Sequence, residues 1–168
     1  MKPTWLIEAE KYVWLAEVPW PKSNPTIQTL WSKLKGGLWF WNTYHEDDSQ
    51  LPWCGMFAAT CLQNSGLPYP EKFASAKSYE TYGISLPSPA VGSIVTFTRD
   101  GGGHVAFVVG QDASGNLICL GGNQGDKVCL ATFARSRATS FRWPKGVNLP
   151  PTDMLPIMDK VEMSKREA

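Results

Sequence analysis

Three residues have the types and the chain order that nucleophilic catalysis needs. Cys54 opens a short apolar segment after Pro52-Trp53, and a helix beginning there would place its thiol where unpaired N–H groups and the macrodipole favour the thiolate. His104 starts an apolar strand after a glycine-rich turn, so its ring can reach a neighbouring helix start and act as a general base. Asn123, one strand later, can accept a hydrogen bond from the ring N–H. The order Cys, His, Asn indicates thiol-based hydrolysis.

Each of these residues also has an ordinary structural explanation. A cysteine in an apolar helix is usually part of the core, and a histidine at a strand start is often satisfied by backbone groups. Asn123 lies in Gly-Asn-Gln-Gly, a common composition of hairpin turns. The order of the three, rather than any one of them, favours the catalytic interpretation.

Helices are expected in the first half of the chain. Apolar residues recur at helical spacing, and Asn24-Pro25 is typical of an N-cap followed by a first-turn proline. Gly66 and Pro68 follow the Cys54 segment in the order that ends a helix. The expected elements are helices at 5–13, 25–34 and 54–64, a weaker helical patch at 74–82, and an irregular loop at 38–50.

Strands are expected in the second half. After Pro89 the pattern changes to period-two and β-branched runs, separated by turn-forming residues. The expected strands are 93–98, 104–109, 117–120, 127–133 and 139–143. Helices first and an antiparallel meander afterwards predict an α+β fold.

Four motifs around the candidate residues resemble those of the CHAP family, the cysteine, histidine-dependent amidohydrolase/peptidases common in bacteriophage lysins and bacteria. The motifs are Leu51-Pro52-Trp53-Cys54-Gly55-Met56-Phe57-Ala58, the run from Pro89 to Phe97, the run from Gly103 to Gly110 that contains Gly-His-Val, and Leu120-Gly121-Gly122-Asn123-Gln124. The resemblance covers about Thr4 to Pro144. It implies a papain-like fold, with N-terminal helices packed on a C-terminal antiparallel sheet, and hydrolysis of an amide bond in peptidoglycan.

The resemblance also implies roles for single residues. Cys54 is the nucleophile, His104 the general base and then acid, and Asn123 the residue that orients the imidazole. Because many family members carry an acidic third residue, Gln124 and Asp126 are alternatives to Asn123.

Gln50 is the expected side-chain donor of the oxyanion hole. Papain-like enzymes place an amide a few residues before the cysteine, and Gln50 is the amide close enough to Cys54 in this sequence. The backbone N–H of Cys54 would be the other donor.

Eight tryptophans suggest either a bulky core or a surface that stacks on flat groups. Trp39, Trp41 and Trp53 precede or adjoin the expected nucleophile, so we expect them to form the walls of a substrate cleft. Four others belong to helical or strand patterns and are expected to pack in the core: Trp5, Trp14, Trp31 and Trp143.

No metal and no cofactor are expected. His45, Asp47 and Asp48 resemble part of a hard-cation site, but they lack further oxygen ligands at regular spacing and are expected to form a solvated loop. The remaining cysteines are expected to be free packing thiols: Cys61, Cys119 and Cys129.

Composition and length exclude several classes of protein. Sixteen basic against 15 acidic residues, with no long run of either sign, do not fit a nucleic-acid partner. The longest uncharged stretch, 49–70, is too polar to cross a membrane, and Glu8 and Glu10 interrupt any secretory signal, so we expect synthesis in the cytoplasm. The 168 residues fit a catalytic domain at 1–145 and a tail at 146–168, which is a loosely ordered end, a peripheral helix or a partner-binding segment; we expect a monomer.

The leading functional hypothesis is a peptidoglycan hydrolase that works through a cysteine acyl-enzyme. It would be an amidase or endopeptidase of the phage endolysin type, reaching the cell wall after release from the cytoplasm. A secreted antibacterial effector and a wall-remodelling enzyme are alternatives with the same chemistry. A non-catalytic module that binds wall glycan or peptide is an alternative of another class, in which the aromatic residues form the cleft and the cysteine is incidental.

Overall fold

The computed structural model describes residues 1–19, 21–43, 52–152, 154–159 and 161. Within these residues, four α-helices precede six strands, as the α+β prediction requires. The helices are α1 (Thr4–Glu10), α2 (Pro25–Ser32), α3 (Gly37–Thr43) and α4 (Cys54–Asn64), with the 3-10 helices η2 (Ala76–Thr81) and η3 (Arg135–Arg137). The strands are β1 (Ile84–Ser85), β2 (Ile94–Arg99), β3 (Gly102–Gln111), β4 (Leu117–Gly121), β5 (Cys129–Phe133) and β6 (Ala138–Trp143).

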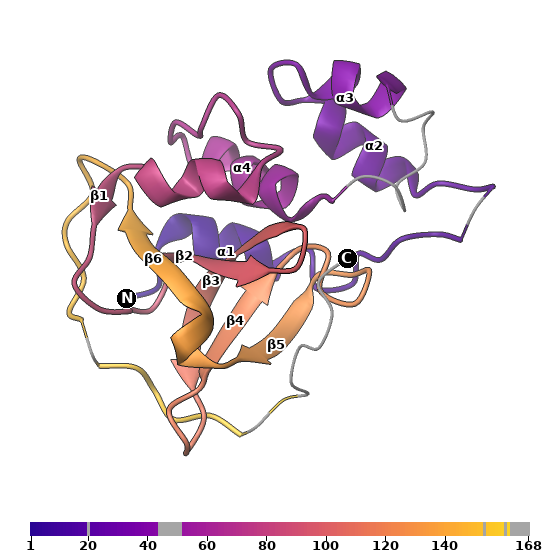
Figure 1. Cartoon of the computed structure of the whole chain (residues 1–168). Helices are drawn as coiled ribbons and strands as arrows, with labels where there is room; N and C mark the ends of the chain where they lie inside the picture. The colour runs from indigo at the N-terminus through magenta and orange to yellow at the C-terminus, as the bar shows by residue number, and fades with distance from the viewer. Residues whose placement is uncertain (20, 44–51, 153, 160, 162–168) are drawn as a thin grey trace.

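The strands form one antiparallel sheet in the order β1-β6-β2-β3-β4-β5. Figure 1 shows α1 and α4 lying over this sheet, with α2 and α3 beyond α4. The start of α4 therefore lies between the sheet and the two outer helices. No helix among the described residues is long and apolar enough to cross a bilayer.

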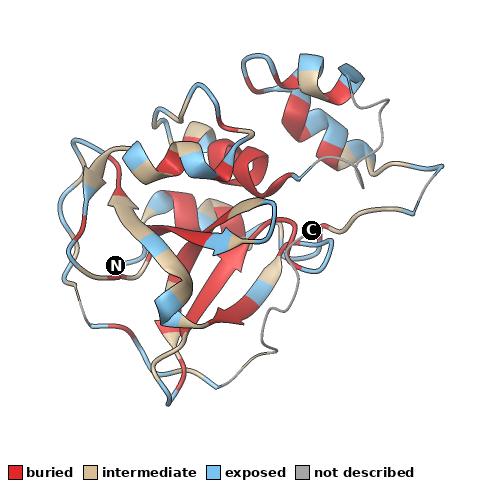
Figure 2. Ribbon diagram, in the orientation of Figure 1, coloured by how far each residue is buried: buried red, intermediate tan, exposed pale blue. Residues whose placement is uncertain are grey.

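The two faces of the sheet bury different side chains. Because successive residues of a strand point to opposite faces, Val105 and Phe107 of β3 join the core beneath the helices, while Ala106 and Val108 join a second core on the other face. Leu155, from beyond the last strand, completes that second core. Figure 2 shows that α4 is buried along most of its length, as a helix packed between layers must be.

The local signals for two helices are confirmed. Asn24 caps α2, with its side-chain oxygen accepting a hydrogen bond from Thr26 N at 2.9 Å. The helix expected at 54–64 is α4, with the same bounds. The first helix ends at Glu10 and continues as turns, so it is shorter than the apolar spacing predicts.

The loop expected at 38–50 is wrong in its first part, where α3 forms. Gly36 adopts a left-handed φ of 81°, which redirects the chain after α2. At Gly37 a Cβ would lie 1.8 Å from the carbonyl oxygen of Trp31, so only glycine permits this close packing of α3 on α2. Residues 44–50 of the expected loop lie outside the described residues.

The described part of the tail packs on the sheet. Gln111 at the end of β3 donates its N–H to Pro156 O at 3.0 Å, and Met158 N–H donates to Gln111 O at 2.8 Å. These bonds extend the sheet where β3 runs past β2, and Leu155 is only 8% exposed. A loosely ordered end is therefore the wrong description for these residues, and no peripheral helix forms among those described.

Candidate active site

The nucleophile candidate, Cys54, is the first residue of α4 and is 3% exposed. The preceding residue, Trp53, is the N-cap, and its indole N–H donates to Glu17 Oε1 at 2.7 Å. The carbonyl of Trp53 accepts the first helical hydrogen bond, from Phe57 N at 2.9 Å. Both the side chain and the backbone of Trp53 therefore hold the start of α4 in place.

The next residue, Gly55, packs directly against the segment that leads to η2. A Cβ at this position would lie 2.0 Å from the carbonyl oxygen of Phe73, a distance that excludes any side chain. The Tyr79 hydroxyl of η2 donates to Gly55 O at 2.7 Å inside the core. This close packing fixes the position of Cys54, the residue before Gly55, relative to its neighbours.

His104 lies near the start of β3, opposite Phe97 of β2, and is fully buried. Its ring lies nearly parallel to two phenylalanine rings: the centroid of His104 is 5.5 Å from that of Phe133 and 6.4 Å from that of Phe97. These two rings fix the orientation of the imidazole plane.

Gln124 supplies the hydrogen bond to His104. Its Oε1 lies 3.0 Å from His104 Nε2, and its amide Nε2 donates to the Cys129 carbonyl at 2.6 Å. Because that carbonyl can only accept, the amide nitrogen must face it and the amide oxygen must face the imidazole. Nε2 of His104 therefore carries a proton in the neutral ring, which leaves Nδ1 to act as the base toward Cys54.

The turn after β4 decides which side chain reaches His104. Asn123 and Asp126 have left-handed φ values of 56° and 64°, which turn the chain so that Gln124 points inward. Asp126 is exposed and its carbonyl accepts from Glu17 N at 2.8 Å. Asn123 is buried beside Gln124, and its role as the orienting residue stays a prediction. The hydrogen bond to His104 favours Gln124, the alternative next to Asn123, as the orienting residue.

The surroundings of Cys54 favour its thiolate. Burial by itself raises the pKa of the thiol, but a hydrogen bond with His104, the charge of that imidazole, the Val105 N–H and the charge of Arg99 lower it, and the net result is a pKa below the usual value.

Two other buried thiols show the opposite behaviour. Burial raises the pKa of Cys61 well above its usual value and also raises that of Cys119. All four cysteines are free, as the sequence predicts. The environment of Cys54 is therefore special to its position and is not a general property of the cysteines in this core.

The tryptophan predictions need correction. Trp41 and Trp53 are fully buried in the core and offer no surface to a substrate, because α3 and the start of α4 pack inward there. Trp39 is 65% exposed on α3 and still fits a binding role. Trp14, expected in the core, is 66% exposed, and its indole N–H donates to Lys11 O.

Two further predictions fall on residues outside the described part of the chain. Gln50, the expected oxyanion donor, is one of them. The group His45, Asp47 and Asp48, expected to be a solvated loop, is the other. Within the residues described, no group of three or more His, Cys, Asp and Glu side chains is placed to hold a metal.

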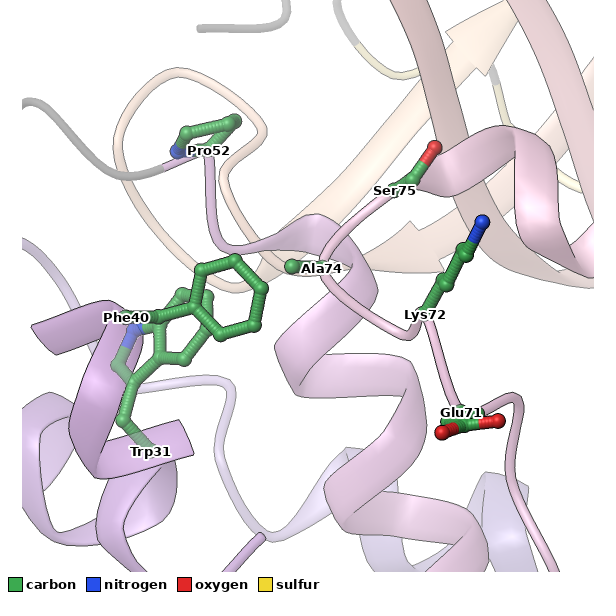
Figure 3. Close-up of a pocket in the computed structure, with 7 residues that line it drawn as sticks. All are labelled: Trp31, Phe40, Pro52, Glu71, Lys72, Ala74 and Ser75. Carbon is green, nitrogen blue, oxygen red and sulfur yellow. The ribbon is translucent and has the colours of Figure 1, made fainter. Parts of the chain in front are cut away.

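A cavity of about 580 Å³ opens beside the start of α4. Figure 3 shows aromatic side chains of α2 and α3 on one side and the segment before η2 on the other. Its lining residues are Trp31, Phe40, Pro52, Glu71, Lys72, Ala74 and Ser75. Only Pro52 belongs to one of the motifs; the lining residues come from four separate parts of the chain, and the fold brings them together.

Comparison with known proteins supports the resemblance seen in the motifs. The family model described as CHAP domain matches residues 46–123, which include Cys54 and His104 and stop one residue before Gln124. No curated protein and no solved structure matches the chain.

Proposed function

We propose that this protein cleaves an amide bond of the bacterial cell wall through a cysteine acyl-enzyme, because the CHAP domain model matches residues 46–123 and such domains are typically hydrolases that act on peptidoglycan. The observation that carries this proposal is the row formed by Cys54, His104 and Gln124. It joins a thiol with a lowered pKa to a base and to a residue that orients the base. This is the arrangement that an activated nucleophile requires.

In the first half of the reaction, Nδ1 of His104 takes the proton of the thiol and the Cys54 sulfur attacks the scissile carbonyl carbon. The carbonyl oxygen becomes an oxyanion, and the Cys54 N–H at the start of α4 is the expected donor that stabilises it. His104 then gives its proton to the leaving amine as the C–N bond breaks, and a thioester remains on Cys54.

In the second half, water replaces the amine. His104 removes a proton from the water as its oxygen attacks the thioester, and the proton then returns to the sulfur as the acyl group leaves. Gln124 holds the same ring tautomer through both halves because its own amide is fixed by the Cys129 carbonyl.

The biological setting belongs to the same proposal. We favour a phage endolysin, made in the cytoplasm and reaching the wall after release, because the motifs resemble those of CHAP domains common in lysins. A secreted antibacterial effector would use the same site. Both roles need the same bond cleavage, so the cleavage is tested first.

The test is digestion of purified cell walls, with the products identified by mass spectrometry. The wild-type protein should clear the walls. An amidase would release peptides that no longer carry the muramoyl group, whereas an endopeptidase would release fragments with a new terminus inside the peptide. Cys54→Ala should retain the fold and lose all activity. Cys61→Ala, which changes a buried thiol of the same helix, should remain active. Undiminished activity of Cys54→Ala would exclude the mechanism.

A further inference from the structure

The cavity beside α4 is close enough to the nucleophile to receive part of a bound substrate. Pro52, two residues before Cys54, lines it, and so do Ala74 and Ser75. The same segment touches the helix at its second residue, where the backbone of Phe73 and Ala74 closes over Gly55. A chain whose scissile carbonyl lies at Cys54 would therefore place a neighbouring residue in this cavity.

One wall of the cavity suits an aliphatic chain. Phe40 lines it with a partly exposed ring, and the fully buried Trp31 supports that ring at a centroid distance of 5.9 Å. Figure 3 shows both rings on the side opposite Glu71, Lys72 and Ser75. Aromatic faces of this kind bury methylene groups favourably, while a polar end group can remain near the opposite rim.

The opposite rim carries one charge of each sign. Glu71 and Lys72 are adjacent in the chain, both are exposed, and both line the cavity. Among the described residues, neither takes part in an ion pair. An acid and a base side by side are complementary to a ligand group that bears an ammonium and a carboxylate close together.

We propose that this cavity is the subsite for the diamino acid of the peptidoglycan stem peptide in its meso-diaminopimelate form, an inference that rests on the proposed function. The methylene chain lies against Phe40. The side-chain ammonium faces Glu71 and the side-chain carboxylate faces Lys72. A lysine at the same place in the peptide has an ammonium for Glu71 but no carboxylate for Lys72.

The experiment compares three soluble disaccharide-tetrapeptides that differ in this residue: meso-diaminopimelate, its form amidated at the side-chain carboxylate, and lysine. The wild-type kcat/KM should fall about two- to fivefold for the amidated and lysine peptides, as expected for one exposed ion pair. Lys72→Gln should abolish the preference for the free carboxylate. Glu71→Gln should lower kcat/KM on all three peptides, because each retains the ammonium. Lys33→Gln, which changes an exposed lysine outside the cavity, should alter nothing.

The outcomes separate this inference from the proposed function. Equal kcat/KM on the three peptides, with active enzyme, would refute the subsite and leave the hydrolase intact. If no peptide is hydrolysed, binding of the same peptides to Cys54→Ala protein decides: a preference for meso-diaminopimelate that Lys72→Gln removes supports the subsite, and equal affinity or no binding refutes it.

Discussion

At the scale of single residues, the reactivity of Cys54 results from opposing effects on the pKa of its thiol. Burial favours the neutral thiol and is the largest single influence on its pKa. His104 opposes it twice, through a hydrogen bond and through its charge, and Val105 N–H and Arg99 add to the opposition. Without the imidazole, only the two weakest of these influences, the Val105 N–H and the charge of Arg99, would oppose the effect of burial on the pKa.

Alkylation of Cys54 by iodoacetamide should therefore depend on His104. In the wild-type protein, the lowered pKa keeps the thiolate populated below the usual thiol pKa of about 8.5, so alkylation should remain fast there. In His104→Ala, the inflection should move above that value. Mass spectrometry of the Cys54 peptide measures the rate at each pH. An ordinary thiol profile in the wild-type protein would instead support the non-catalytic binding module.

Gln124 and Asn123 can be separated as orienting residues. Gln124→Ala removes the hydrogen bond to His104 Nε2 and should lower kcat about tenfold, since such a bond contributes about 1–1.5 kcal/mol. Asn123→Ala should retain the bond. The ¹⁵N NMR shifts of His104 measure the tautomer directly, and only Gln124→Ala should change them. A tautomer change in Asn123→Ala alone would restore the prediction made from the sequence.

The sequence locates some residues of the site and cannot locate others, as Asn123 and Gln124 show. Cys54 and His104 begin or adjoin regular elements, so local signals of helix start, turn and strand locate them. Asn123 and Gln124 are adjacent buried amides in one turn, and which of them reaches His104 depends on the left-handed backbone at Asn123. That conformation is a product of the folded turn and has no separate signal in the residue types.

At the scale of elements, the site depends on contact between the first turn of α4 and the turn after β4. A Cβ at Gly122 would lie 2.6 Å from Cβ of Phe57 and 2.9 Å from the indole of Trp53. The turn that carries Gln124 therefore rests on the helix that carries Cys54.

Gly122→Ala should push these two elements apart. We expect a destabilisation of about 1–3 kcal/mol, as for overpacked sites, together with a loss of activity that persists well below the unfolding temperature. Thermal unfolding and wall digestion measure the two effects. In Gly102→Ala, the new Cβ has no neighbour closer than 3.7 Å, so that variant should change neither. Equal behaviour of the two variants would contradict the coupling.

Elements with strong local signals were predictable, and α3 was not. The strands alternate and are bounded by turns, and α2 has its cap. α3 is seven residues long and rich in aromatic residues, which have no strong helical propensity. It forms because Gly37 lets it approach Trp31 and because Trp41 is buried there, and both causes are tertiary.

At the scale of the whole molecule, the sheet separates two cores and the catalytic groups depend on both. The helices cover one face, and the stacked rings of Phe97, Phe133 and His104 lie on the face that Leu155 helps to cover. The family match ends at residue 123, and the boundary expected at 145 stays a prediction. The contacts of Leu155 nevertheless make the tail part of the second core.

Leu155 should therefore contribute to global stability, whereas its neighbour Ile157 should not. Leu155 is 8% exposed against the second core, and Ile157 is 72% exposed although its backbone bridges Gln111. Leu155→Ala should lower the free energy of unfolding by about 2–3 kcal/mol, the lower end for a buried leucine, and Ile157→Ala by less than about 0.5 kcal/mol. Urea unfolding measures both. Equal stability of the two variants would mean that the second core is complete without the tail, and that 1–145 suffices as the folding unit.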